Sequence, residues 1–150
     1  MNAKARNATC KEHRIVKNVS KIKVAEHGKS AVFLNPNRDS IHIVRVDGGV
    51  VENECSADFA VSHPGVGDII VELKGKEVKR ACEQIAATAL TIKKCKKDKS
   101  AVAGLIVCTR VPATDSTSLR LKNKFMQEHR AILKICASNK EYSFDEFFGK

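Results

Sequence analysis

A predicted β-hairpin that runs directly into a predicted helix constrains the fold of this chain most. Residues 55–75, CSADFAVSHPGVGDIIVELKG, contain two apolar runs separated by SHPGVG, whose Pro and two Gly are typical of a turn. The following residues, 76–94, have the spacings of three and four that an amphipathic helix requires. The apolar positions of that pattern are Val78, Ala81, Ile85, Ala89 and Ile92. A strand pair followed at once by such a helix predicts a sheet that is covered by helices.

The remaining segments complete this prediction. The first 25 residues have apolar positions at Cys10, Val16, Val19 and Ile22, which favour a helix. Residues 29–49 predict a first hairpin, with the turn at Asn35-Pro36-Asn37. Residues 101–109 predict a central strand, 117–129 a helix, 131–137 the last strand, and 141–150 an aromatic tail that packs back. The predicted fold class is α/β (α+β), a central mixed sheet with antiparallel hairpins flanked by helices.

Length and composition favour one folded domain over residues 1–150, because 43% of the residues are apolar and 29% are charged. No apolar stretch has the roughly 18 residues of a membrane span, and the N-terminus lacks the apolar segment of a signal peptide. We therefore expect a cytoplasmic protein that does not enter a membrane. The six cysteines are scattered without a CxxC, which favours buried free thiols. Cys10 and His13 have zinc-like spacing but no second pair.

The net charge of +10 favours a polyanionic partner. Counterion release rewards basic surfaces that bind nucleic acid, and we expect DNA rather than RNA. The basic residues are concentrated in residues 93–99, in 120–124 and in the first two dozen residues. A lysine run that only keeps the protein soluble is the alternative.

The hairpin brings acidic residues together if Gly65 is the midpoint of its turn. Asp58 and Glu72 are each seven residues from Gly65, so they face each other across the two strands. Side chains alternate along a strand, which places Lys74 on the face of Glu72. We expect Phe59, Val61, Val71 and Leu73 to point to the other face, against the helices. A register shift of one residue would turn Asp58 away.

This grouping predicts chemistry on phosphate. Two carboxylates that face each other repel unless a cation lies between them, and Mg²⁺ or Mn²⁺ prefers such oxygen ligands. A lysine beside them can orient a water or stabilise the charge that develops on phosphate. The pattern therefore predicts metal-dependent hydrolysis of phosphodiesters. A solvated cross-strand pair of Glu72 and Lys74 remains the structural alternative.

The segment SADFAVSHPGVGDIIVELKG and the following KEVKRACEQI resemble the PD-(D/E)XK nuclease superfamily, which includes restriction endonucleases and Holliday junction resolvases, and the resemblance covers about residues 46–85. Asp58 matches the first acidic position of its motif, and Glu72 and Lys74 match the Glu-x-Lys on the next strand. The resemblance implies a restriction endonuclease-like fold, an Mg²⁺-dependent endodeoxyribonuclease, and a metal held by Asp58, Glu72 and the main-chain carbonyl of Leu73. Ala57 stands where the family usually has proline.

The resemblance also implies two further site positions. A glutamate near the N-terminus often completes the metal site, and either Glu12 or Glu26 could do so. Gln84 matches a glutamine that some nuclease branches carry on the following helix, and the alternative is an ordinary surface glutamine.

Three other polar residues, Asp68, His42 and His63, have no predicted role in the site. Asp68 is too far along its strand to share a metal with Glu72, and we assign no catalytic role to His42 or to His63, which we expect to be exposed.

The alternative functions are a non-catalytic nucleic-acid-binding module and a small protein-interaction factor of the immunity or toxin type. A homodimer is an open alternative to a monomer.

Overall fold

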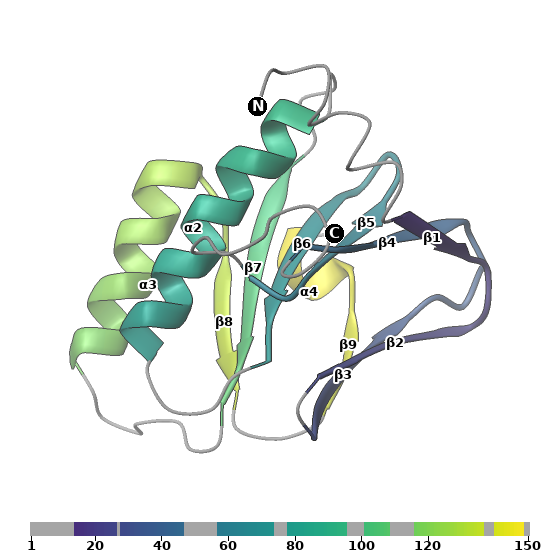
Figure 1. The fold of residues 1–150 in the computed structure, drawn as a ribbon, viewed down its shortest axis with the longest axis horizontal. Coiled ribbons are helices and arrows are strands. Elements are labelled where there is room, and N and C mark those ends of the chain that lie inside the picture. The colour runs from purple at the N-terminus through teal and green to yellow at the C-terminus, as the bar shows by residue number, and fades with distance from the viewer. Residues whose placement is uncertain are drawn as a thin grey trace.

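The computed structural model describes residues 14–26, 28–46, 57–73, 78–95, 101–108, 116–136 and 140–148. Figure 1 shows the arrangement of its helices and strands. The strands are β1 (Arg14–Lys17), β2 (Lys21–Glu26), β3 (Lys29–Leu34), β4 (Ile41–Arg45), β5 (Phe59–His63), β6 (Gly67–Glu72), β7 (Val102–Val107), β8 (Leu133–Cys136) and β9 (Glu141–Ser143). The helices are α2 (Val78–Cys95), α3 (Ser116–His129) and α4 (Asp145–Phe148).

The main sheet has six strands in the order β1-β4-β5-β6-β7-β8. Pairing is antiparallel from β1 to β6 and parallel from β6 to β8. Every residue of β6 and of β7 is buried. A strand that is covered on both faces requires apolar side chains in both directions, as the runs Ile69–Val71 and Val102–Val107 provide. The predicted mixed α/β sheet is therefore confirmed, and so is the central position of β7.

A second sheet contains three strands in the order β2-β3-β9. β2 and β3 are antiparallel, and β9 lies parallel to β3. Alternate residues of β2, Ile22 and Val24, are buried, while Lys21 and Lys23 between them are exposed. This period of two is the pattern of a strand with one face on a core and one face in solvent.

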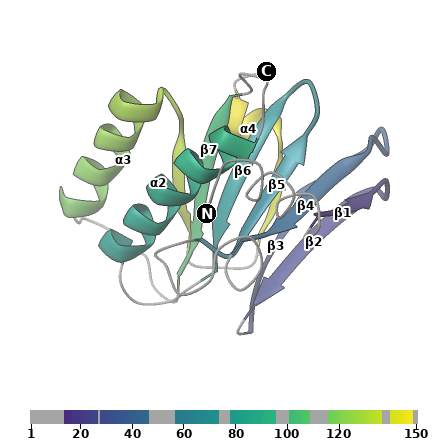
Figure 2. The same cartoon turned by 45° about the horizontal axis from the view of Figure 1, so that its top comes forward.

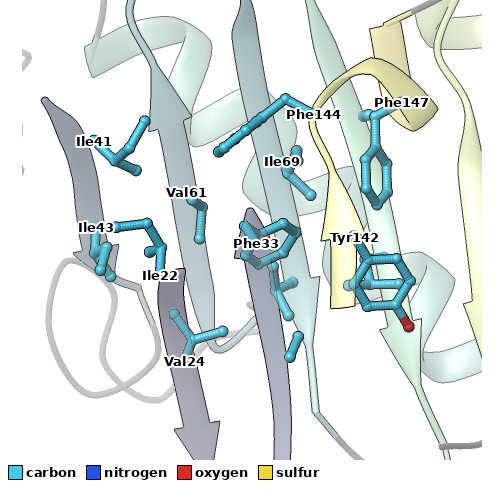
Figure 3. Packing of buried hydrophobic residues seen from close by; sticks show 14 of the residues in the cluster. Ile22, Val24, Phe33, Ile41, Ile43, Val61, Ile69, Tyr142, Phe144 and Phe147 are labelled. Carbon is cyan, nitrogen blue, oxygen red and sulfur yellow. The ribbon is translucent and has the colours of Figure 1, made fainter. Parts of the chain in front are cut away.

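The two sheets and the helices form three layers (Figures 1 and 2). Helices α2 and α3 cover one face of the main sheet, and the second sheet and α4 lie on its other face. The core between the sheets contains Phe33, Val61, Ile69 and aromatic residues of the C-terminal segment (Figure 3). Phe144 and Phe147 are both buried there, so the prediction that the aromatic tail packs back is confirmed.

Three sequence-based predictions about these elements are wrong. Residues 14–17 and 21–26 form strands, not a helix; their β-branched residues favour strands, and each segment gains a distant partner strand. β3 and β4 form no hairpin together, since they belong to different sheets. Residues 133–136 are not the last strand, because β9 follows them.

Candidate functional site

Asp58 and Glu72 lie opposite each other at one end of the β5–β6 hairpin. The two strands pair from His63 with Gly67 to Phe59 with Val71, and Asp58 and Glu72 are the next residues outward. The turn between them contains Gly65 with a φ of 83°, a left-handed conformation that glycine adopts without strain. The register that places Gly65 at the midpoint of the turn is therefore confirmed.

Hydrogen bonds fix Asp58 to the end of β6. Its main-chain N–H donates to the carbonyl of Val71 at 3.1 Å, and the N–H of Leu73 donates to its carboxylate Oδ2 at 2.8 Å. Asp58 thus binds the residue on each side of Glu72. The bond to Leu73 uses Oδ2, and the second carboxylate oxygen, Oδ1, takes no part in it.

Glu72 lies on the face of the sheet that helix α2 covers, and Asp58 bonds to the residues on either side of it. Ile70 and Ile106 pack in the cluster formed by α2 and α3, and Glu72 alternates with Ile70 and pairs with Ile106. Ala60, two residues after Asp58, packs with Ile92 of α2. Asp58 is 2% exposed and Glu72 is 0% exposed. Two acidic side chains at this end of the hairpin are therefore removed from water, and Glu72 lies beneath α2.

Helix α2 presents two polar side chains to the sheet. Gln84 and Thr88 are buried and lie one helical turn apart, which places them on the same face of α2. The hydroxyl oxygen of Thr88 accepts a hydrogen bond of 2.7 Å from the N–H of Ala57, the residue before Asp58. The alternative interpretation of Gln84 as a surface residue is therefore wrong, because it belongs to the inward stripe that also contains Ala81 and Ile85.

One prediction about the two faces of the hairpin is wrong. Val61, Val71 and Leu73, with Phe59 packed against them, belong to the core between the two sheets and not to the core under the helices. The alternation was predicted correctly, but the layer on each face was not. Glu72 lies on the helix side, and an unforeseen second sheet covers the other side.

Of the predicted lysine and the two candidates for a third acid, the structure describes only Glu26. Lys74 and Glu12 lie outside the described residues. Glu26 lies on β2, in the second sheet, and its carboxylate is 3.4 Å from the Arg45 guanidinium. Glu26 is therefore not brought to the face that carries Glu72, and Glu12 is the remaining candidate.

The chemistry of the donor set fits a hard divalent cation. Asp58 and Glu72 supply carboxylate oxygens, and Leu73 follows directly with a main-chain carbonyl. Mg²⁺ is commonly bound through one or two carboxylates while several of its waters are retained. Within the part of the chain that the structure describes, no group of three or more His, Cys, Asp or Glu side chains could hold a metal ion. The main-chain carbonyl and waters would therefore have to complete the coordination.

Polar residues elsewhere on the hairpin lie apart from Asp58 and Glu72. Asp68 is buried near the turn, opposite Ser62, four residues from Glu72 along β6. His63 was predicted to be exposed, which is wrong. Its Nε2 lies 3.0 Å from an Asp39 carboxylate oxygen, and its ring contacts Phe144 edge-on at 4.7 Å between centroids. These contacts give His63 a role in joining the turn to the C-terminal segment.

Sequence reasoning missed Thr88. The residue lies four positions after Gln84, on the face of α2 that the apolar spacing already assigns to the core, so helical periodicity alone could have found it.

The predicted free thiols are confirmed where the structure describes them, since Cys82 and Cys108 are buried without a disulfide and Cys136 is a half-buried free thiol.

The chain matches no family model, no curated protein and no solved structure. Among the described helices, none is both long enough and apolar enough to span a membrane.

Proposed function

We propose that this protein is a metal-dependent nuclease that hydrolyses phosphodiester bonds, with DNA as the expected substrate. The observation that carries the proposal is that two buried acids, Asp58 and Glu72, lie just beyond the last pair of an antiparallel hairpin, with Glu72 under helix α2. The resemblance of this segment to the PD-(D/E)XK motif supports the same chemistry, and so does the net charge of +10.

The burial of the two carboxylates supports a cation at this position. An ionised carboxylate that is removed from water requires a compensating positive charge or a proton, and two facing carboxylates require it more strongly. A bound divalent metal would supply that charge, and it would lower the pKa of a coordinated water and polarise the phosphate. Asp58, Glu72 and the carbonyl of Leu73 would hold it.

The chain's own residues supply the positioning. The N–H of Leu73 holds the Asp58 carboxylate, and Thr88 holds the main chain just before it. Lys74 would donate to a phosphate oxygen or orient the attacking water, which are the roles that a lysine beside two carboxylates can fill. Gln84 would donate a side-chain N–H within the site. A fixed arrangement of this kind lowers the cost of reorganisation during the reaction.

A cleavage assay tests the proposal. Wild type is incubated with linear, branched and single-stranded DNA and with RNA, in the presence of Mg²⁺ or Mn²⁺. We expect cleavage that requires metal and is lost in Glu72→Gln, which changes the charge but keeps the size. Glu83→Gln is the matched control, because Glu83 lies on the exposed face of α2. This variant should cleave DNA like wild type. If wild type cuts no substrate with either metal, the proposed nuclease activity is wrong.

A nucleic-acid-binding module without catalysis is the second candidate. The near-complete burial of Asp58 and Glu72 favours it, since a buried acidic pair can serve the fold alone. In that case metal would not raise the melting temperature, because only ligands that bind the folded state stabilise it. A thermal shift with Mg²⁺ or Mn²⁺ in wild type but not in Glu72→Gln would decide for the metal site.

A further inference from the structure

The edge strand β1 leads into an unusually exposed segment. β1 forms one edge of the main sheet, and every residue from Arg14 to Lys21 is exposed. Ile15 is 59% exposed and Val16 is 51% exposed, so two adjacent apolar side chains lie in solvent between the basic residues Arg14 and Lys17. We call residues 14–23 the β1 arm. Figures 1 and 2 show β1 beside β4 at the edge of the main sheet, on the far side of that sheet from α3.

The β1 arm carries basic side chains that no acidic side chain in the described ranges compensates. Residues 14–46 contain seven basic residues, Arg14, Lys17, Lys21, Lys23, Lys29, Arg38 and Arg45, and two acidic residues, Glu26 and Asp39. Both acids already have partners, since Glu26 pairs with Arg45 and Asp39 with His63. Lys21 pairs with Glu141 at 2.6 Å. Arg14, Lys17 and Lys23 form no ion pair with any residue in the described ranges.

Register places Arg14 near the acidic end of the hairpin, on the side of the sheet that α2 covers and that carries Glu72. Arg14 pairs with Val44, which packs with Ala60 and Ile92 of α2. Two residues after Val44, just beyond the end of β4, the N–H of Val46 donates to the carbonyl of Asp58. Two strand spacings and two residues correspond to roughly 12 Å between the Cα atoms of Arg14 and Asp58. That distance is about three to four nucleotides along one strand of a duplex.

A second copy of the chain fits this edge poorly. If two β1 strands paired antiparallel about their centre, Arg14 of one copy would lie directly opposite Lys17 of the other. Like charges at opposed positions destabilise a strand pair. A polyanion, in contrast, can take the cations on both faces of this edge. Arg14 lies opposite Val44, on the α2 side, and Lys17 lies opposite Ile41, on the side of the second sheet. Most protein–DNA hydrogen bonds are made to phosphate and sugar, and basic side chains are among the groups that make them.

We propose that the β1 arm is a nucleic-acid-binding surface, in which Arg14, Lys17 and Lys23 hold backbone phosphates and Arg14 holds those nearest the carboxylates. The position of the cut relative to the arm rests on the proposed nuclease function. The binding itself does not, so it can be measured on its own.

The experiment measures the equilibrium binding of a short fluorescent DNA duplex, without metal, between about 50 and 200 mM salt. Arg14→Gln/Lys17→Gln removes two charges from exposed side chains. Arg120→Gln/Lys124→Gln removes two exposed charges from α3, which packs beside β8 at the other edge of the sheet. Each phosphate contact contributes about 0.9 to the slope of log K against log salt. We expect the β1 variant to lose about 1.8 from the slope and to bind on the order of 10- to 100-fold more weakly.

Every other result contradicts the proposal. Equal losses in the two variants would mean that net charge alone drives binding, and a larger loss in the α3 variant would move the surface to α3. An unchanged slope in the β1 variant, or no binding by wild type at about 50 mM salt, would exclude nucleic acid from the arm. Cleavage by wild type is measured separately. If wild type cleaves DNA but the β1 variant keeps the salt slope of wild type, the proposed binding surface is wrong and the proposed nuclease function stands. Melting curves of both variants confirm that they fold.

Discussion

The Asp58 carboxylate accepts the N–H of Leu73, and this bond joins the first acidic residue of the hairpin to the residue that follows the second. Together with the bond from the Asp58 N–H to Val71, it fixes both sides of Glu72. A carboxylate held in this way has one role in the fold, as an acceptor, and one in the proposed chemistry, as a metal ligand. Substitutions can separate the two roles.

Asp58→Asn keeps an acceptor for the N–H of Leu73 and removes the charge. We expect this variant to unfold at nearly the urea concentration of wild type, but to lose its stabilisation by Mg²⁺ or Mn²⁺ and to cleave at least about 100-fold more slowly. Asp58→Ala removes the acceptor as well, so its free energy of unfolding should fall by about 1–3 kcal/mol. Urea denaturation with and without metal measures both effects. Equal stabilisation of wild type and Asp58→Asn by metal would show that Asp58 is not a ligand.

Thr88 provides a second test, at a distance from the reacting groups. Thr88→Val keeps the shape of the side chain but leaves the buried N–H of Ala57 without its acceptor, which should cost about 1–3 kcal/mol. If Thr88 positions Asp58, the affinity for metal should fall as well, and Thr88→Ser should restore it. Titration with Mn²⁺, followed by the melting temperature, measures this. Thr91→Val is the control, because the Thr91 hydroxyl bonds only within its own helix, to the carbonyl of Ala87.

Asn35 holds the corner at which the chain passes from one sheet to the other. Its side-chain N–H groups donate to the carbonyls of Val19 and Asp39, each at 2.9 Å, and its Oδ1 accepts the N–H of Asp39. The side chain is buried, so Asn35→Ala leaves three main-chain groups without these partners. We expect a loss of about 2–4 kcal/mol in the free energy of unfolding.

Asn37→Ala is the matched control for this corner, because Asn37 is exposed two residues later in the same loop. Chemical denaturation of both variants gives the comparison. A similar small loss in both would mean that the corner is held by its backbone bond from Asn35 to Ser20 and not by the side chain.

The parts of this structure that could be predicted from sequence are those with local causes. Pro64, Gly65 and Gly67 determine the turn, and the turn determines that Asp58 faces Glu72. The spacing from Val78 to Ile92 predicts α2 because a helix forms its hydrogen bonds within one segment. Both features depend on residues that are close in the chain.

The parts that could not be predicted depend on distant partners. Val16, Val19 and Ile22 are three residues apart, which resembles a helix, but β1 pairs with β4 and β2 with β3. Alternation shows that β6 has two faces and does not tell which layer covers each one. The burial of Gln84 and the pairing of Glu26 with Arg45 likewise follow from the packing of whole layers.

Cys82 gives a prediction about pH. Burial, with a smaller contribution from the charge of Glu83, raises the pKa of its thiol from 9.0 to about 11. The unfolded chain therefore loses this proton at a lower pH than the folded protein does. Stability from this group is complete below about pH 9 and is lost as the pH rises from about 9 to about 11, by up to about 1.4 kcal/mol per pH unit.

Urea denaturation across this range, with Cys82→Ala for comparison, measures the effect, and the decline should be shallower in the variant. Tyr142, whose pKa is also raised by burial, contributes equally to both proteins. Alkylation gives an independent readout: in native protein the buried Cys82 should react with iodoacetamide far more slowly than the half-buried Cys136, and peptide mapping separates the two. Parallel declines in the two proteins, or rapid labelling of Cys82 at neutral pH, would contradict a raised pKa.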